Sequence, residues 1–189
     1  TYTMMGYDSP GGEEVGVIPR LCEGLLLAVN SAIHNSSGTE LDSNTEIVTA
    51  MKNRVLSAEL SLSYYEIYNE KVHDLLSNSP DISCKVRESK DEGAFVENLT
   101  RKSFVNYKTV VSILEEGNKK RVTAATLMNA TSSRSHAVFT VHIYQQIVPI
   151  SVNSATSSPA GSGSPTNAII SRQSKVSLVD LAGSERASL

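Results

Sequence analysis

The stretch KVSLVDLAGSER, residues 175–186, decides the fold of this chain. Its near-continuous apolar beginning is typical of a buried strand in a sheet that helices cover. The strand would end at Asp180, and Gly183 follows three residues later. In open α/β sheets, ligands bind beyond the carboxyl ends of the strands, where a carboxylate can hold Mg²⁺ through water and a glycine can present its N–H to a phosphate. Asp-x-x-Gly alone is more typical of an ordinary turn, but the full string after an apolar run predicts a phosphate-sensing turn.

A second stretch, NATSSRSH at residues 129–136, has the side chains that a nucleoside triphosphate needs from a protein. Its hydroxyls can hydrogen-bond phosphate oxygens or enter a Mg²⁺ shell, and its asparagine can orient a water or a phosphate. The residues with these roles are Asn129, Ser132, Ser133 and Ser135. The same residue types cap helices, so a plain helix-to-strand loop is the competing interpretation. His136 can orient a water, although a histidine that starts a strand is more often packed or solvated.

Arg134 changes the balance between these two interpretations. An arginine beside phosphate-binding serines can form a bidentate ion pair with Glu185 of the first stretch. Such a pair would join the two loops, and it would form or break with the terminal phosphate as an order–disorder switch. Together the two stretches predict the two switch segments of an ATPase that senses its bound phosphate.

The composition is that of an ordinary globular domain. The chain has 189 residues, 40% of them hydrophobic and 20% charged, and a net charge of −3. This charge favours no polyanionic partner, so contact with an acidic surface would need a local basic patch. No apolar run approaches the ~20 residues that span a bilayer, and no basic-then-apolar leader suggests secretion. Cys22 and Cys84 have no metal-type spacing, and we expect them to be packing residues in a reduced compartment.

Helical and strand-like patterns alternate along the chain. We expect one helix from Pro19 to Ile33 and another over 106–121, where Gly117 would end it. The other expected elements are a strand at 56–70, a helical turn at 69–76, a strand pair around the loop 89–93, and strands at 135–148 and 175–183. Residues 35–46 and the Ser-, Gly- and Pro-rich 151–167 read as exposed or flexible loops. The alternation predicts an α/β sheet with helices on both faces.

Five longer sequence segments are more specific than this pattern of helices and strands. TYTMMG, GVIPR, SYYEIYNEKVHDLL, GNKKRVTAATLMNATSSRSHAVFTV and KVSLVDLAGSERAS resemble the kinesin motor domain in order and spacing, and some details are similar to the kinesin-three subfamily. The resemblance covers nearly the whole chain apart from 35–55 and 149–173, which read as loop insertions. It implies an α/β fold, a P-loop NTPase-type three-layer sandwich truncated at both ends. Its central sheet would be mixed and mostly parallel, with helices on both faces.

The resemblance also implies a role for each matching residue, with ATP as the nucleotide and Mg²⁺ as its metal ion. Thr1 would bind Mg²⁺ through its hydroxyl, although a threonine before a helix is most often only its N-cap. The implied catalytic residues are Asn129, Ser132, Ser133, Arg134, Gly183 and Glu185. The implied nucleotide-binding residues are Thr1, Tyr2, Ser132, Ser133, Asp180 and Gly183, of which Thr1, Ser133 and Asp180 would hold the metal with its waters.

The implied partner is the microtubule, in the cytoplasm and its cytoskeleton. Arg101 and Lys102, in the loop near 88–102, are candidates for contact with acidic tubulin, although such a pair is also typical of solvated surface. We expect no nucleic-acid partner and no membrane insertion. The rival interpretation is a non-catalytic, kinesin-like microtubule-binding or scaffold protein. Small GTPases and myosin fit the two switch strings less well.

The chain departs from the family pattern at its ends. It starts without a methionine, at Thr1, and the glycine-rich loop with its lysine, which would hold the β- and γ-phosphates, does not precede it. The family's main microtubule-binding helix would follow Leu189. We therefore expect a fragment that binds ATP poorly on its own and whose sheet has open edges.

Overall fold

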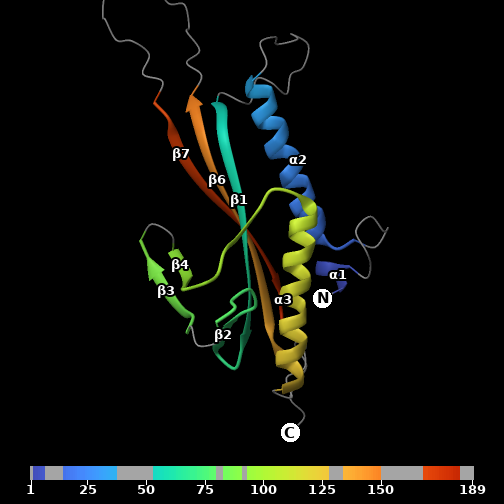
Figure 1. The fold of residues 1–189 in the computed structure, drawn as a ribbon. Helices are drawn as coiled ribbons and strands as arrows, with labels where there is room; N and C mark the ends of the chain where they lie inside the picture. Colours follow the sequence, from blue (N-terminus) through green and yellow to red (C-terminus); the bar gives the residue numbers. More distant parts are fainter. Residues whose placement is uncertain are drawn as a thin grey trace, which may run out of the picture.

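The computed structural model describes residues 2–6, 15–37, 53–79, 83–90, 93–127, 134–149 and 168–183. Their elements are α1 (Tyr2–Met5), α2 (Val17–Ser37), β1 (Asn53–Tyr68), β2 (Lys71–Asp74), β3 (Lys85–Ser89), β4 (Gly93–Glu97), β5 (Lys102–Phe104), α3 (Tyr107–Leu127), β6 (His136–Pro149) and β7 (Ile170–Asp180). The long strands form a twisted central sheet with the three helices along one face and the β3–β4 hairpin on the other side (Figure 1). None of the described helices is both long and apolar enough to cross a membrane.

The strand order of the main sheet is β2-β1-β6-β7, with β5 also paired to β1, and every pairing among the described residues is antiparallel. The predicted α/β class is confirmed, but this part of the sheet is not mostly parallel, and its described helices cover one face. The chain path explains the difference. β2 and β5 carry the chain back along β1 before α3 begins, so α3 ends beside the end of β1 and β6 returns in the opposite direction (Figure 1). A parallel neighbour would need a crossover that starts where β1 ends.

The helix-facing side of the sheet forms the core, because successive side chains of a strand point to opposite faces. Its buried strand residues include Leu60, Leu62, Tyr64, Phe139 and Val141. The opposite face of the same strands carries mainly polar side chains, among them Ser61, Ser63, Thr140 and His142. The strand expected at 135–148 is confirmed as β6, whose successive side chains alternate between these two faces.

The sequence predicts a helical turn over 69–76, and this prediction is wrong. Lys71–Asp74 is strand β2, which pairs antiparallel with residues 65–68 of β1. Asn69 and Glu70 form the connection with φ angles of 48° and 61°. Positive φ at both positions is what a two-residue type I′ hairpin turn requires, and glutamate is not a residue that this turn favours. The hairpin signal is therefore weak in the sequence.

Gly117 does not end α3, because the helix continues to Leu127. The glycine serves close packing instead. A Cβ at this position would collide with the ring of Tyr64, whose hydroxyl donates to Oδ1 of Asn118 at 3.0 Å. The same ring meets Phe139 edge-on, with ring centroids 6.1 Å apart. Gly117 thus lets α3 approach β1 and seats the buried Tyr64.

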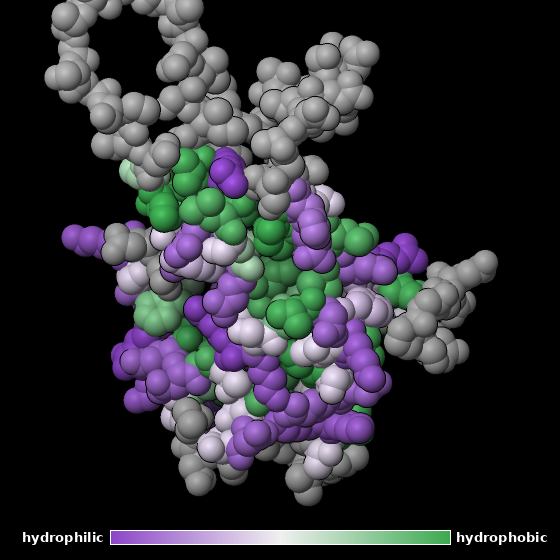
Figure 2. Space-filling model, turned by 45° about the horizontal axis from the view of Figure 1, so that its top comes forward, coloured by the Kyte–Doolittle hydropathy of each residue, from purple (hydrophilic) through white to green (hydrophobic). Residues whose placement is uncertain are grey.

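The sequence predicts a buried strand at 175–183, but β7 is exposed along most of its length. β6 is its only partner among the described residues, so β7 is the edge of the described sheet, and apolar residues such as Val179 reach solvent. Figure 2 shows apolar side chains between polar ones at the surface. Parts of the predicted insertions are regular structure, since α2 extends to Ser37, β1 begins at Asn53 and β7 begins at Ile170. Most of the predicted loop 35–46 and all of the predicted loop 151–167 lie outside the described residues.

Ion pairs tie α3 to neighbouring segments. Glu116 accepts hydrogen bonds from Lys102 of β5 and, at 2.9 Å, from Lys120 one turn further along α3. Lys120 Nζ also donates to the carbonyl oxygen of Ser77 at 2.8 Å. Hydrogen bonds from Lys102 and Lys120 hold the pKa of Glu116 below its ordinary value, although partial burial acts in the opposite direction. These lysines therefore fasten α3 to β5 and to the segment that follows β2.

Replacing Gly117 with alanine should destabilise the fold, although alanine is the better helix former. Helix propensity favours the change by about 1 kcal/mol, but the new Cβ meets the Tyr64 ring, and overpacking a core costs about 1–3 kcal/mol. Gly24 of α2 is the matched control, because a Cβ there meets nothing within 4 Å. Gly24→Ala should therefore stabilise. Urea unfolding shows whether each substitution raises or lowers the free energy of unfolding. A Gly117→Ala protein that is more stable than wild type would contradict this packing.

Acid should remove the stabilisation that Glu116 provides. Its folded pKa is lowered from 4.5, so the contribution is present above that value and is lost as the pH falls through the folded pKa. The side chain is 36% exposed, so we expect the small, screened effect of a surface pair. In urea unfolding, Glu116→Gln should be less stable than wild type near neutral pH, and the difference should vanish in acid. A difference that does not change with pH would rule this out.

Candidate functional site

The register of β6 and β7 places parts of the two predicted switch stretches side by side. The strand ladder ends at the pair Ala137↔Asp180. Arg134 and Ser135 lie just before β6, and Gly183 lies just after β7. The chain segments that leave this last pair therefore meet at one end of the sheet.

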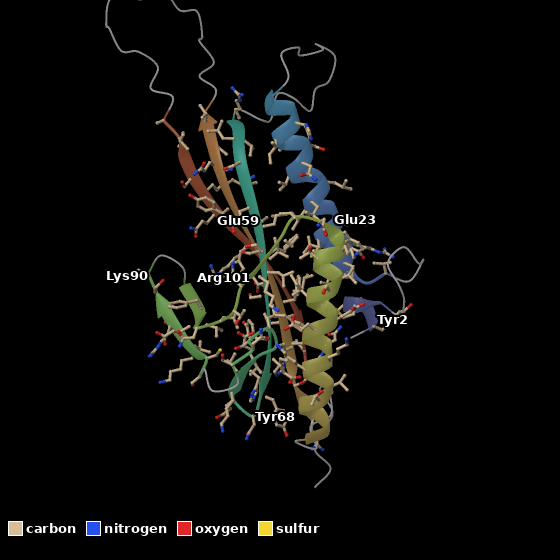
Figure 3. The ribbon with its side chains drawn as sticks, in the orientation of Figure 1. Tyr2, Glu23, Glu59, Tyr68, Lys90 and Arg101 are labelled. Atoms are coloured by element: carbon tan, nitrogen blue, oxygen red, sulfur yellow. The ribbon has the colours of Figure 1, made fainter. Side chains whose placement is uncertain are left out.

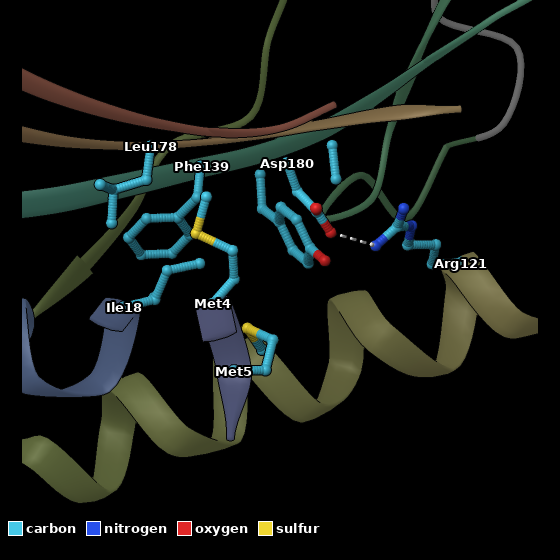
Figure 4. A pocket seen from close by; sticks show the side chains of 9 residues that line it. Met4, Met5, Ile18, Arg121, Phe139, Leu178 and Asp180 are labelled. Carbon is cyan, nitrogen blue, oxygen red and sulfur yellow. Dashed lines mark ion pairs between the residues drawn. The ribbon is translucent and has the colours of Figure 1, made fainter. Parts of the chain in front are cut away.

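A small cavity lies at this end, between the strands and α1 (Figure 4). Its lining residues are Met4, Met5, Ile18, Tyr64, Arg121, Ala137, Phe139, Leu178 and Asp180. The volume of about 10 Å³ leaves room for one water at most, so the cavity marks close packing and is not itself a nucleotide pocket. It shows that α1, the helix that follows Thr1, packs beside Asp180.

One buried guanidinium connects this end of the sheet to α3. Arg121 Nε donates to Oε1 of Glu66 on β1 at 3.0 Å, and Nη2 donates to Oγ of Ser135 at 3.5 Å. The Ser135 hydroxyl donates in turn to the same Glu66 oxygen. Arg121 Nη1 lies 3.7 Å from Oδ2 of Asp180 (Figure 4). We refer to Glu66, Arg121, Ser135 and Asp180 as the arginine cluster.

The arginine cluster holds its charges largely out of water. The side chains of Arg121 and Glu66 are 9% and 10% exposed. Burial disfavours the charged guanidinium, but the hydrogen bond to Glu66 and the neighbouring negative groups outweigh it and raise the pKa of Arg121. Burial also raises the pKa of the adjacent Tyr64 hydroxyl. Removing one partner of such a buried pair is strongly destabilising, because the other charge is left alone.

A second link joins the two stretches through the backbone. Nδ1 of His136, the first residue of β6, accepts a hydrogen bond from the N–H of Ala182 at 3.0 Å. Ala182 lies between Asp180 and Gly183 in the turn after β7. His136 is half-buried, so it is neither simply solvated nor fully packed. It fastens the start of β6 to the predicted phosphate-sensing turn.

The other predicted site residues are only partly described by the structure. Tyr2 begins α1 and is 52% exposed, and both Arg134 and Gly183 are exposed. The site residues outside the described part of the chain are Thr1, Asn129, Ser132, Ser133 and Glu185. The ion pair between Arg134 and Glu185 therefore stays a prediction.

The two basic residues predicted to contact tubulin have different surroundings. Lys102 is paired with Glu116 and is 27% exposed, so the fold holds it, and the structure does not favour it as a free surface charge. Arg101 is exposed and lines a groove of about 880 Å³ between the β3–β4 hairpin and the polar face of the sheet. Figure 3 shows Arg101 beside the sheet, whereas Lys90 lies at the tip of the hairpin.

The sequence patterns assign no site role to Glu66 and Arg121. Arg121 belongs to a basic run after a glycine, which is typical of a helix end. For Glu66, the strand periodicity does indicate a buried position. It continues the inward-facing series of residues 60, 62 and 64 on β1, and a carboxylate at an inward position needs a buried partner.

Of the residues predicted to hold Mg²⁺, Asp180 is the one that the structure describes. No group of three or more His, Cys, Asp or Glu side chains that could hold a metal occurs in the described part of the chain. Mg²⁺ keeps several waters and takes one or two carboxylates beside phosphate oxygens. A single strand-end carboxylate with a 22% exposed side chain therefore fits this ion, whereas an all-protein metal cage does not.

Comparisons with known proteins cover nearly the whole chain. The family model described as the kinesin motor domain matches residues 1–189. Kinesin-related protein 1 of Dictyostelium discoideum is 39% identical and kinesin-like protein unc-104 of Caenorhabditis elegans 37% identical, each over 99% of this chain but only 7% and 10% of those proteins. A solved structure of a fast kinesin matches with a TM-score of 0.68 and 29% identity, over 98% of this chain and 41% of that one. The chain belongs to the kinesin motor domain family.

Proposed function

We propose that this chain is part of a microtubule motor head that hydrolyses ATP. The observation that carries the proposal is the arginine cluster. In it, the guanidinium of Arg121 on α3 contacts Glu66 of β1, Ser135 before β6 and the carboxylate of Asp180 at the end of β7. The solved fast kinesin is described in terms of its ATPase mechanism and its interactions with microtubules. The chain spans less than half of that structure, so the activity of the whole protein is inferred from the likeness together with this geometry.

The proposed site residues act by positioning and by charge, as phosphoryl transfer requires. Asp180 would hold Mg²⁺ through water, and the Gly183 N–H would bind the terminal phosphate. The residues proposed to complete the site are Thr1, Tyr2, Asn129, Ser132 and Ser133. Mg²⁺, when bound, supplies charge neutralisation for the phosphate oxygens. Arg121 sets the position and the electrostatic surroundings of Asp180 from the protein side.

Arg121 also gives the proposed site a way to act as a unit. Asp180 and Ser135 belong to different switch stretches, and the same guanidinium contacts both. A movement of Asp180 when the terminal phosphate is lost would change a buried charge pair, so Ser135 and Glu66 would have to adjust with it. The proposed clasp between Arg134 and Glu185 would open or close in the same step.

Removing the Arg121 charge should strongly reduce ATP turnover. We expect Arg121→Gln to lower microtubule-stimulated kcat by about 10²–10³-fold, the usual loss when a preorganised electrostatic group is removed. The assay uses a head extended with the parent gene's own flanking sequence to the length of the solved kinesin. Arg172→Gln on the exposed edge strand is the matched control and should keep full turnover. A wild-type head that binds microtubules but never turns over ATP would instead favour the scaffold alternative.

A double variant separates this role from stability. Arg121→Gln leaves Glu66 buried without its partner, which costs about 3–5 kcal/mol, so the single variant can lose activity by unfolding. Replacing the pair with Arg121→Met and Glu66→Leu removes both charges, and such apolar replacements are often neutral or stabilising. We expect the double variant to regain stability in urea unfolding and to remain inactive. Wild-type turnover in the double variant would show that the cluster serves the fold alone.

Arg134→Ala should uncouple the nucleotide state from microtubule affinity. If Arg134 and Glu185 form one ion pair, either alanine substitution breaks it, and the double variant should be no worse than the single ones. The measurement is the ratio of microtubule affinities with an ATP analogue and with ADP. We expect the ratio to fall toward one in all three variants. A wild-type ratio in Arg134→Ala, or additive effects of the two substitutions, would count against the clasp.

A further inference from the structure

The hydrogen bond between His136 and Ala182 begins where the β6–β7 ladder stops. The last ladder pair is Ala137↔Asp180, and the turn then leaves the sheet. At this point the imidazole Nδ1 of His136 accepts a hydrogen bond from the Ala182 N–H at 3.0 Å. A neutral imidazole that accepts at Nδ1 carries its proton on Nε2, so this contact defines one tautomer.

The contact restrains the peptide that precedes the predicted phosphate donor. The Ala182 N–H belongs to the planar peptide that joins residues 181 and 182. The next peptide carries the Gly183 N–H, and only φ and ψ of Ala182 lie between the two planes. Holding the Ala182 N–H therefore restricts the direction in which the Gly183 N–H points.

We propose that His136 is a positioning residue that aims the Gly183 N–H at the terminal phosphate of ATP. The proposal rests on the proposed function, because that function assigns the phosphate to Gly183. His136 acts through the Ala182 peptide and does not itself touch the nucleotide. It belongs to the same stretch as Ser135, so this stretch holds the turn after β7 through a backbone contact as well as through the arginine cluster.

Two substitutions separate positioning from packing. Asparagine carries Oδ1 on the same carbon that carries Nδ1 in histidine, so His136→Asn keeps an acceptor within reach of the Ala182 N–H. Glutamine has one more methylene, which moves its oxygen toward the place of Nε2 and leaves Ala182 without this partner. Both variants lose the aromatic ring, so a role in ring packing would be lost in both.

The functional test compares the affinities of the extended head for AMP-PNP, an ATP analogue that is not hydrolysed, and for ADP. His136→Gln should bind AMP-PNP about tenfold more weakly, as expected when one hydrogen bond to a charged group is lost. ADP affinity should stay unchanged, because ADP has no terminal phosphate. His136→Asn should keep both wild-type affinities. Equal weakening by Asn and Gln, or equal weakening for both nucleotides, would overturn the positioning role.

A spectroscopic measurement tests the contact apart from motor activity. In ¹⁵N-labelled protein, the Ala182 amide resonance should change in His136→Gln and stay near its wild-type position in His136→Asn. Nδ1 of wild-type His136 should show the resonance of an unprotonated nitrogen. An unchanged Ala182 amide in His136→Gln would overturn the inference directly. If the amide behaves as expected but the wild-type head binds no AMP-PNP, the proposed function fails, and the phosphate role of His136 fails with it.

Discussion

A guanidinium that is 9% exposed imposes the main constraint on this structure. A charge removed from water needs counter-charges and hydrogen-bond acceptors on several sides. Arg121 finds them on β1, before β6 and at the end of β7. These elements can satisfy it only if α3 lies along one face of the sheet and the two switch stretches meet at one end. The placement of the proposed site therefore follows from the requirement to neutralise one side chain.

Two kinds of contact converge at this end of the sheet. The arginine cluster is made by side chains and responds to charge, whereas the contact from His136 to Ala182 holds the backbone. α1 packs against the same place through Met4 and Met5. A charged group and a backbone turn are thereby held within one small region, next to the helix that follows Thr1. Under the proposed function, such a region would couple the presence of a phosphate to the arrangement of several chain segments.

Much of the fold could be predicted from the sequence, because hydrophobic periodicity is a local signal. The two long helices, the β3–β4 hairpin and the two faces of β6 follow from it. The β2 strand could not be predicted in this way, because Asn69 and Glu70 form a type I′ turn without the glycine that usually marks one. The antiparallel order of the main sheet also lies beyond local patterns, since it depends on where the chain returns before α3. At the site, the motifs pointed to Asp180, but its partner Arg121 comes from a helix 59 positions earlier, and no motif spacing connects them.

The close packing of the Tyr64 ring against Gly117 limits how α3 can move along its axis. The residues one turn away from Gly117 on the same helix face are Ile113, Leu114, Lys120 and Arg121, and each carries a Cβ. Sliding the helix by one turn, about 5.4 Å along its axis, would therefore bring one of these side chains against the ring. The contact between Gly117 and the Tyr64 ring therefore fixes the axial position of α3 relative to β1. α3 can then serve as a stationary reference for the strands that pack against it.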